Sequence, residues 1–156
     1  MKKKIIGGAG LTLLISCFIH PFGAKTNSSA PILAGADVDP AVTRVIEKSC
    51  QNCHSERTEW PWYSYAAPMS WLIEKDVHEA RSHMNLSRWP QYDAAKQREL
   101  LAELAAVVRN HRMPLPRYTL LHPGAKPGPE ELDRIYQWSK LERRRLAALE
   151  SAHAAQ

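Results

Sequence analysis

Cys50-Gln51-Asn52-Cys53-His54 is the stretch of this 156-residue chain around which the rest is organised. Two thiols three positions apart, followed at once by an imidazole, form the attachment signature of c-type haem. Each thiol can add to one vinyl group of the porphyrin, and His54 can reach the iron as an axial ligand. The motif therefore predicts one haem c, bound covalently through Cys50 and Cys53 and ligated by His54.

Three other chemistries use the same residue types. A thioredoxin-like dithiol needs strands alternating with helices, and the sequence has no run of alternating β-branched and aromatic residues. A zinc site completed by His78 and His83 would have suitable ligands, but those histidines lie 25 or more positions from the thiols, at no known finger spacing. A simple disulfide suits an oxidising compartment but leaves the adjacent histidine unexplained. Haem attachment is the favoured interpretation.

The N-terminal part of the chain differs from the rest. Lys2, Lys3 and Lys4 precede an apolar run from about residue 5 to residue 20, in the pattern of a secretory leader. The run is shorter than the roughly 20 residues of a full membrane span. Residues 1–24 are thus predicted to be a signal peptide or a membrane anchor, and a lipobox-like Leu14-Ile15-Ser16-Cys17 adds lipidation at Cys17 as a third route. All three routes deliver the remaining chain across the inner membrane into the periplasm. The expected location is a periplasmic domain anchored to the inner membrane by the leader, with release into the periplasm or lipidation at Cys17 as alternatives.

The net charge of +5 is also a property of this leader. Four of the 21 Lys and Arg residues precede Asp37, whereas all 16 Asp and Glu residues lie at or after it, which leaves 17 basic against 16 acidic residues. A basic surface for nucleic acid is therefore not expected.

Residues 25–38 are rich in Ala, Gly, Ser and Pro and are predicted to form a flexible tether, followed by one domain over residues 39–150. Apolar positions recur at helical spacing within it, so the expected fold is all-α, a small cytochrome c-like helical domain. Ser70 is expected to cap the second helix, and the prolines between residues 111 and 128 are expected to exclude helix there. The predicted helices span residues 40–49, 71–82, 93–110 and 130–149.

An aromatic stretch, Trp60-Pro61-Trp62-Tyr63-Ser64-Tyr65, follows the motif. A rigid loop that plugs the core is one interpretation, because Trp and Tyr are often buried with their polar edge satisfied. The sharper hypothesis is that Trp60, Trp62 and Tyr63 wall the haem and exclude water from it.

Met113, directly before Pro114, is the expected sixth ligand of the iron. A thioether on a stiff loop suits an electron-transfer haem, because His/Met ligation raises the reduction potential. An ordinary apolar role for Met113 is the alternative. Other side chains able to ligate are Met84 as second choice, Met69, His78, His83, His111 and His122.

Several linked motifs resemble one known family, the haem-binding domain family of small bacterial cytochrome c-like proteins. The resemblance covers about residues 37–140. It rests on Ser49–Ser55, Thr58, Trp60–Ser64, Ala67–Trp71, Asp76-Val77, Asn85–Trp89, Met113-Pro114, Tyr118 and His122-Pro123.

The resemblance implies an α-helical c-type haem domain exported to the periplasm, often on an N-terminal anchor. It implies that Cys50 and Cys53 hold the haem, that His54 is the proximal ligand and that Met113 is the distal one. Ala80 stands where the family usually has glycine, a difference that concerns local helix packing.

The expected function is electron transfer by a monohaem cytochrome that meets redox partner proteins, rather than catalysis. A peroxidase-like enzyme is an alternative, with His111 or Arg112 over an open iron site, and a haem-based redox or gas sensor is another. The run Arg143-Arg144-Arg145 is either a solvated helix end or a docking patch for an acidic redox partner.

Overall fold

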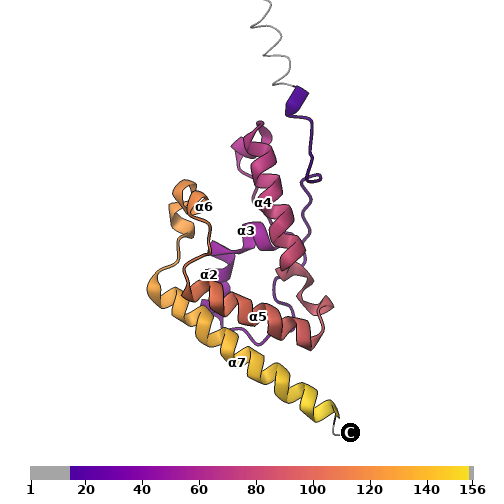
Figure 1. Cartoon of the computed structure of the whole chain (residues 1–156), viewed down its shortest axis with the longest axis vertical. Helices are drawn as coiled ribbons and strands as arrows, with labels where there is room; N and C mark the ends of the chain where they lie inside the picture. Colours follow the sequence, from indigo (N-terminus) through magenta and orange to yellow (C-terminus); the bar gives the residue numbers. More distant parts are fainter. Residues whose placement is uncertain (1–14, 155–156) are drawn as a thin grey trace, which may run out of the picture.

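The computed structural model describes residues 15–154, and its two longest helices, α5 (Ala94–Arg109) and α7 (Pro129–Ala154), pack side by side (Figure 1). Leu100, Leu104 and Val108 of α5 are buried together with Ile135 and Trp138 of α7. No strand occurs within the described part of the chain, so the all-α expectation is confirmed. This pair forms the base on which the other elements rest.

The helix that leads into the cysteine motif, α2 (Pro40–Ser49), packs on α7. Asp39 begins it as predicted, because its carboxylate accepts a hydrogen bond from the Ala41 amide at 2.6 Å and Pro40 takes the first helical position, where no amide donor is needed. Val42, Val45 and Ile46 form its buried side. The short helix α3 (Gln51–His54) then carries the motif itself.

Between the motif and α5 lies α4 (Met69–His83), flanked by two short 3₁₀ helices, η1 (Trp62–Tyr65) and η2 (Leu86–Gln91). Ser70 does not cap α4, since the helix begins at Met69 and no hydrogen-bond partner for the Ser70 hydroxyl lies among the described residues. The aromatic stretch 60–65 was expected to be an irregular loop, but it includes the 3₁₀ turn η1. Trp89 on η2 is buried, with 1% of its surface exposed.

The expectation that residues 111–128 contain no helix is wrong. A short helix, α6 (Pro116–Leu121), and a 3₁₀ turn, η3 (Pro123–Ala125), lie in this range. Both begin at a proline, whose fixed φ suits the first helical position and whose missing amide is not required there. Prolines that would break a helix interior here start new helices instead.

Residues 25–38, predicted to be a tether, contact the domain at several points. Leu33 is buried in the core with 3% exposed, and its amide donates to the Leu86 carbonyl at 2.9 Å. The indole N–H of Trp138 donates to the Asp37 carbonyl at 2.8 Å.

The predicted leader falls mostly on residues 1–14, outside the described part. Within residues 15–154, none of the helices is long and apolar enough to cross a membrane.

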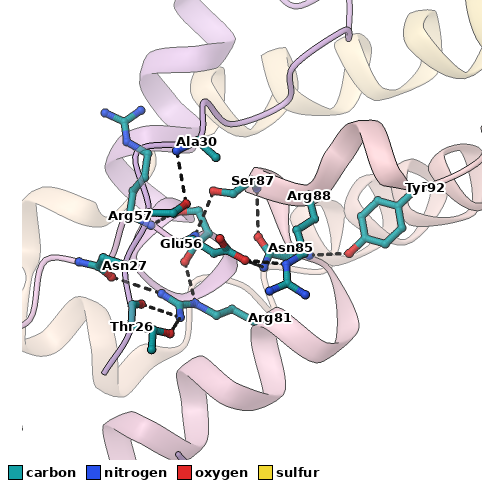
Figure 2. A network of polar contacts seen from close by, with 12 residues as sticks. Thr26, Asn27, Ala30, Glu56, Arg57, Arg81, Asn85, Ser87, Arg88 and Tyr92 are labelled. Atoms are coloured by element: carbon teal, nitrogen blue, oxygen red, sulfur yellow. Dashed lines mark hydrogen bonds and ion pairs between the residues drawn. The ribbon is translucent and has the colours of Figure 1, made fainter. Parts of the chain in front are cut away.

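The loop that follows the motif is fixed by a polar network around Glu56 (Figure 2). Its carboxylate accepts hydrogen bonds from Arg88 Nε at 2.6 Å and from Asn85 Nδ2 at 3.1 Å, while its amide donates to the Ser87 hydroxyl at 3.0 Å. Arg81 extends the network by donating to the Ser55 carbonyl at 2.8 Å. The loop after α3 is thereby joined to α4 and η2.

This network predicts a pH-dependent effect of Glu56→Gln. The hydrogen bond from Arg88 lowers the pKa of Glu56, so its carboxylate adds stability above the ordinary pKa of a glutamate and loses it as pH falls through the lowered value. We expect the variant to lower the free energy of unfolding by about 1 kcal/mol at pH 7. The deficit should be smaller at about pH 3, below the ordinary pKa of a glutamate, and should vanish below the lowered pKa of Glu56. Urea denaturation at both pH values measures this, with the exposed Glu59→Gln as control. An equal loss at both pH values would contradict the assignment.

Candidate functional site

The cysteine motif opens on a cavity of about 440 Å³, within the range of roughly 300–1,000 Å³ typical of small-molecule sites, and its walls are largely apolar. The walls come from α3, α4, α5 and the segment around α6. Apolar lining side chains include Leu72, Ile73, Val77, Leu100, Leu104, Val107, Leu115 and Leu121.

The two thiols of the motif face this cavity together. Cys50 lies at the junction of α2 and α3, and the Cys53 amide donates to its carbonyl at 3.2 Å, a helical step that brings positions three apart to one face. Cys50 and Cys53 both line the cavity and are not joined in a disulfide. Burial is the main reason that the pKa of Cys50 is raised to about 12 and that of Cys53 to about 11. The neighbouring Cys53 adds to the rise at Cys50, and the Asp76 carboxylate adds to the rise at Cys53. Both are therefore protonated at neutral pH in the protein without bound haem.

His54 is oriented by the backbone of the residue after α4. Its Nδ1 lies 3.1 Å from the Met84 carbonyl, and because a carbonyl only accepts, Nδ1 carries the proton. The other nitrogen, Nε2, is left with its lone pair. Burial lowers the pKa of His54, which favours the neutral imidazole. A neutral ring whose far N–H donates to a carbonyl is the usual state of a metal-ligating histidine.

The zinc alternative has no support in the geometry. Among residues 15–154, no group of three or more His, Cys, Asp or Glu side chains is placed to hold a metal ion. His83 lines the cavity, but its Nε2 pairs with Glu103 at 2.8 Å. His78 does not line this cavity at all.

All three methionines named as sixth-ligand candidates line the cavity, in different positions. Met113 and Met69 lie at the surface, with 39% and 36% exposed, whereas Met84 is 8% exposed. The Met84 carbonyl holds Nδ1 of His54, so its backbone lies on the side of the imidazole opposite to Nε2. His111 is exposed and does not line the cavity.

His122 reaches the cavity, but both of its ring nitrogens are engaged. Nδ1 lies 3.0 Å from the Tyr118 carbonyl and therefore donates to it, which leaves Nε2 to accept from the Tyr63 hydroxyl at 3.0 Å. The ring also stacks on Tyr118, with centroids 4.4 Å apart. The geometry accounts for His122 as a packing and hydrogen-bonding residue.

Side chains that the motif analysis did not assign hold the Met113 segment across the cavity. Arg117 on α6 pairs with Asp76 on α4 through two contacts, at 2.6 and 3.1 Å. The Tyr118 hydroxyl accepts from Asn52 Nδ2 at 3.0 Å, and Asn52 lies between the two cysteines. Asn52, Asp76 and Tyr118 did occur among the motifs that carried the family resemblance, but only the fold reveals what they contact, and Arg117 lay outside those motifs.

The structure places the three aromatic residues predicted to wall the haem in different surroundings. Tyr63 lines the cavity, but Trp60 and Trp62 do not. Trp62 is 83% exposed, and Trp60 lines a second cavity on the other side of α4, described below.

The residues present therefore suit a haem, since two unpaired thiols, a neutral imidazole and an apolar cavity occur at one place. No curated protein and no solved structure matches the chain significantly. A protein-family model described as a haem-binding domain matches residues 11–141, which is most of the chain and includes every residue of the site. The chain belongs to the haem-binding domain family.

Proposed function

We propose that this protein is a monohaem c-type cytochrome that transfers electrons in the bacterial periplasm. The observation that carries the proposal is that Cys50, Cys53 and His54 line one apolar cavity that Met113 also lines. In this proposal the two thiols hold one haem through thioether bonds, and His54 and Met113 provide the axial ligands. The bound iron would supply reversible one-electron exchange.

The chain's own groups prepare the proximal side. The Met84 carbonyl keeps the proton of His54 on Nδ1, so Nε2 is available without a prior proton transfer. This hydrogen bond also fixes the plane of the ring and increases the basicity of the ligand. Apolar side chains around the thiols exclude water, which favours the less charged, reduced state of a bound redox centre.

Met113 is the best-placed side chain for the distal role. His122 has both nitrogens engaged, and the Met84 backbone lies behind His54. Met69 also lines the cavity, but it lies on α4, which supplies the Met84 carbonyl just beyond its C-terminal end. Met113 lies on a separate segment, between α5 and α6, which Arg117 and Tyr118 fasten to α4 and α3.

The exposed position of Met113 keeps a second function under consideration. If its thioether does not ligate, the iron would have an open site, as a peroxidase-like enzyme or a gas sensor requires. Arg112 and His111, the polar groups expected over such a site, do not line the cavity. Tyr63 does line the cavity, but its hydroxyl donates a hydrogen bond to His122 and is therefore already engaged. Electron transfer remains the function that the geometry favours.

The proposed location is the outer face of the inner membrane, with the leader as anchor, signal peptide or lipidation segment. A redox protein is the proposed partner, and it would approach the edge at Cys50 and Cys53. Arg143 and Arg144 are exposed on α7, whereas Arg145 pairs with the buried Glu142 at 2.6 Å. Of these three arginines, Arg143 and Arg144 have no ion pair within residues 15–154, so these two would be available to an acidic partner.

Carbon monoxide separates the two candidate functions, because it binds ferrous haem only at a free coordination position. For an electron carrier we expect reversible one-electron reduction and, on mixing the reduced protein with carbon monoxide, a spectrum that changes slowly or not at all. A complete change within the mixing time would instead indicate an open site and favour the enzyme or sensor. A second measurement, the stoichiometry of haem to protein, should give one.

A further inference from the structure

A buried carboxylate on α4 has no part in the haem site. The Glu74 side chain is 2% exposed, and an ionised carboxylate so far from water requires a charged or hydrogen-bonding partner. Its Oε1 contacts Lys25 Nζ at 2.8 Å and His20 Nδ1 at 2.7 Å. Both partners come from the segment that precedes the domain.

The ammonium group of Lys25 is enclosed on its other sides by aromatic rings. Its Nζ lies 4.8 Å from the ring centroid of Tyr65 and 5.5 Å from that of Trp60, within the roughly 6 Å over which a cation is attracted to a ring face. The Lys25 side chain is 10% exposed. Glu74, Trp60 and Tyr65 thus form a site for a primary ammonium group, and the chain fills it with its own lysine.

Further contacts follow the same segment, residues 19–28, which we call the arm. The indole N–H of Trp71 donates to the Ile19 carbonyl at 2.8 Å. Arg81 Nη1 donates to the Thr26 carbonyl at 2.9 Å (Figure 2). The Ser28 amide donates to the Glu56 carbonyl at 2.6 Å. These bonds join the arm to α4 and to the loop after the haem motif along the length of the segment.

The arm and the haem cavity lie on opposite sides of α4. Trp71, Glu74 and Arg81 contact the arm, whereas Ile73, Asp76 and Ala80 line the haem cavity. A second cavity, of about 570 Å³, opens between the arm and α4 and is lined by residues of both. The arm therefore supports, from behind, the helix that forms one wall of the haem cavity.

We propose that the arm is a docked part of the domain, locked by insertion of Lys25 into the site of Glu74, Trp60 and Tyr65. The mature protein then retains the chain at least from Ile19 onward. Two residues of the aromatic stretch, Trp60 and Tyr65, serve this docking rather than the wall of the haem cavity. Docking holds the domain in one orientation relative to whatever precedes the arm. That this orientation presents the haem edge to a partner rests on the proposed function.

Trypsin tests the docking directly, because it cleaves after an accessible lysine and needs a locally unfolded segment. Full-length protein in detergent is digested, and the rate of cleavage between Lys25 and Thr26 is followed by mass spectrometry. In Glu74→Gln the side chain keeps its shape but loses the charge that balances Lys25. We expect cleavage there to be at least about tenfold faster than in the wild type, since it tracks the open population and tenfold corresponds to about 1.4 kcal/mol.

The matched control is Glu79→Gln, which removes a carboxylate from the same helix. The Glu79 side chain is 62% exposed, lies 3.7 Å from Lys75 and lines the haem cavity rather than the cavity beside the arm, so its loss should leave the rate at Lys25 unchanged. Trp71→Phe, which deletes the bond to Ile19, is a second variant should Glu74→Gln fail to fold, and it should also accelerate the cleavage. The absorption spectrum of each variant checks that the haem domain is intact, so loss of the haem itself would be seen separately.

Three results would overturn the proposal. The first is a wild-type cleavage rate at Lys25 equal to that of a synthetic peptide of residues 19–31. The second is an equal rate of cleavage at Lys25 in the wild type, in Glu74→Gln and in Trp71→Phe, when all three proteins retain the wild-type absorption spectrum. The third is an intact mass that places the mature N-terminus after Ile19. A wild-type rate far below that of the peptide, with faster cleavage in Glu74→Gln, supports docking.

Discussion

Replacing both motif thiols, Cys50→Ser with Cys53→Ser, is expected to abolish covalent haem attachment completely. Each thioether requires a sulfur at its position, and the two thiols face one cavity. Intact mass spectrometry of protein exported in a host with a haem maturation apparatus should fall from polypeptide plus one haem to polypeptide alone. Any pigment left should be extracted by acidified organic solvent. Either single substitution should leave one thioether and a labile, spectrally altered product.

Cys17→Ser provides the matched control, since it replaces the remaining cysteine without touching the motif. The haem-dependent mass should be unchanged in this variant, and a separate loss equal to a lipid would reveal the lipobox route. Haem that stays covalently bound in the double variant would refute attachment at Cys50 and Cys53. If the wild-type protein were colourless and contained zinc, the motif would be a zinc site rather than a haem attachment site.

Met113→Ala is expected to remove the sixth ligand of the iron. The weak near-infrared thioether-to-iron band of the ferric protein should disappear, and the reduced variant should bind carbon monoxide rapidly. The reduction potential should fall by about 0.1 V or more, because a thioether ligand raises it and axial ligation sets haem potentials over roughly 0.8 V. Optical spectroscopy and a redox titration of the same samples measure all three effects.

Met69→Ala is a close control, because Met69 lines the same cavity and has a similar exposed fraction, 36% against 39% for Met113. It should leave the band and the potential unchanged. A band that survives in Met113→Ala but disappears in Met69→Ala would move the distal ligand to α4. Persistence in both variants would return Met84 to consideration, despite its position behind His54.

The helices with a clear apolar period were predictable from sequence to within a few residues. Pro40–Ser49 was located by its Asp-Pro start and its Val/Ile spacing, and α5 by its leucines. The helix at Pro116–Leu121 was missed because proline was weighed as a helix breaker, although at the first position it favours a helix. Ser70 was misjudged as a cap because the helix boundary itself lies at Met69.

The candidate site also contains residues that sequence could single out and residues that only the structure could place. The two thiols, the histidine and Met113 could be named as candidates from local spacing, and the structure brings all four to one cavity. The placement of Trp60 could not, since an aromatic side chain suits a cofactor wall, a core or a cation site equally well. Which of these it meets depends on Lys25, a residue 35 positions earlier that carries no motif.

Sequence alone thus predicted a haem cofactor and the helical class of the fold, and it named Cys50, Cys53 and His54 as the residues expected to hold the haem, because each prediction depends on residues a few positions apart. Only the tertiary structure decided what lies on the two sides of α4. It placed the haem cavity on one face and the arm with its buried Lys25–Glu74 pair on the other. Contacts between residues about 50 positions apart depend on how the helices pack, which no local pattern of side chains encodes.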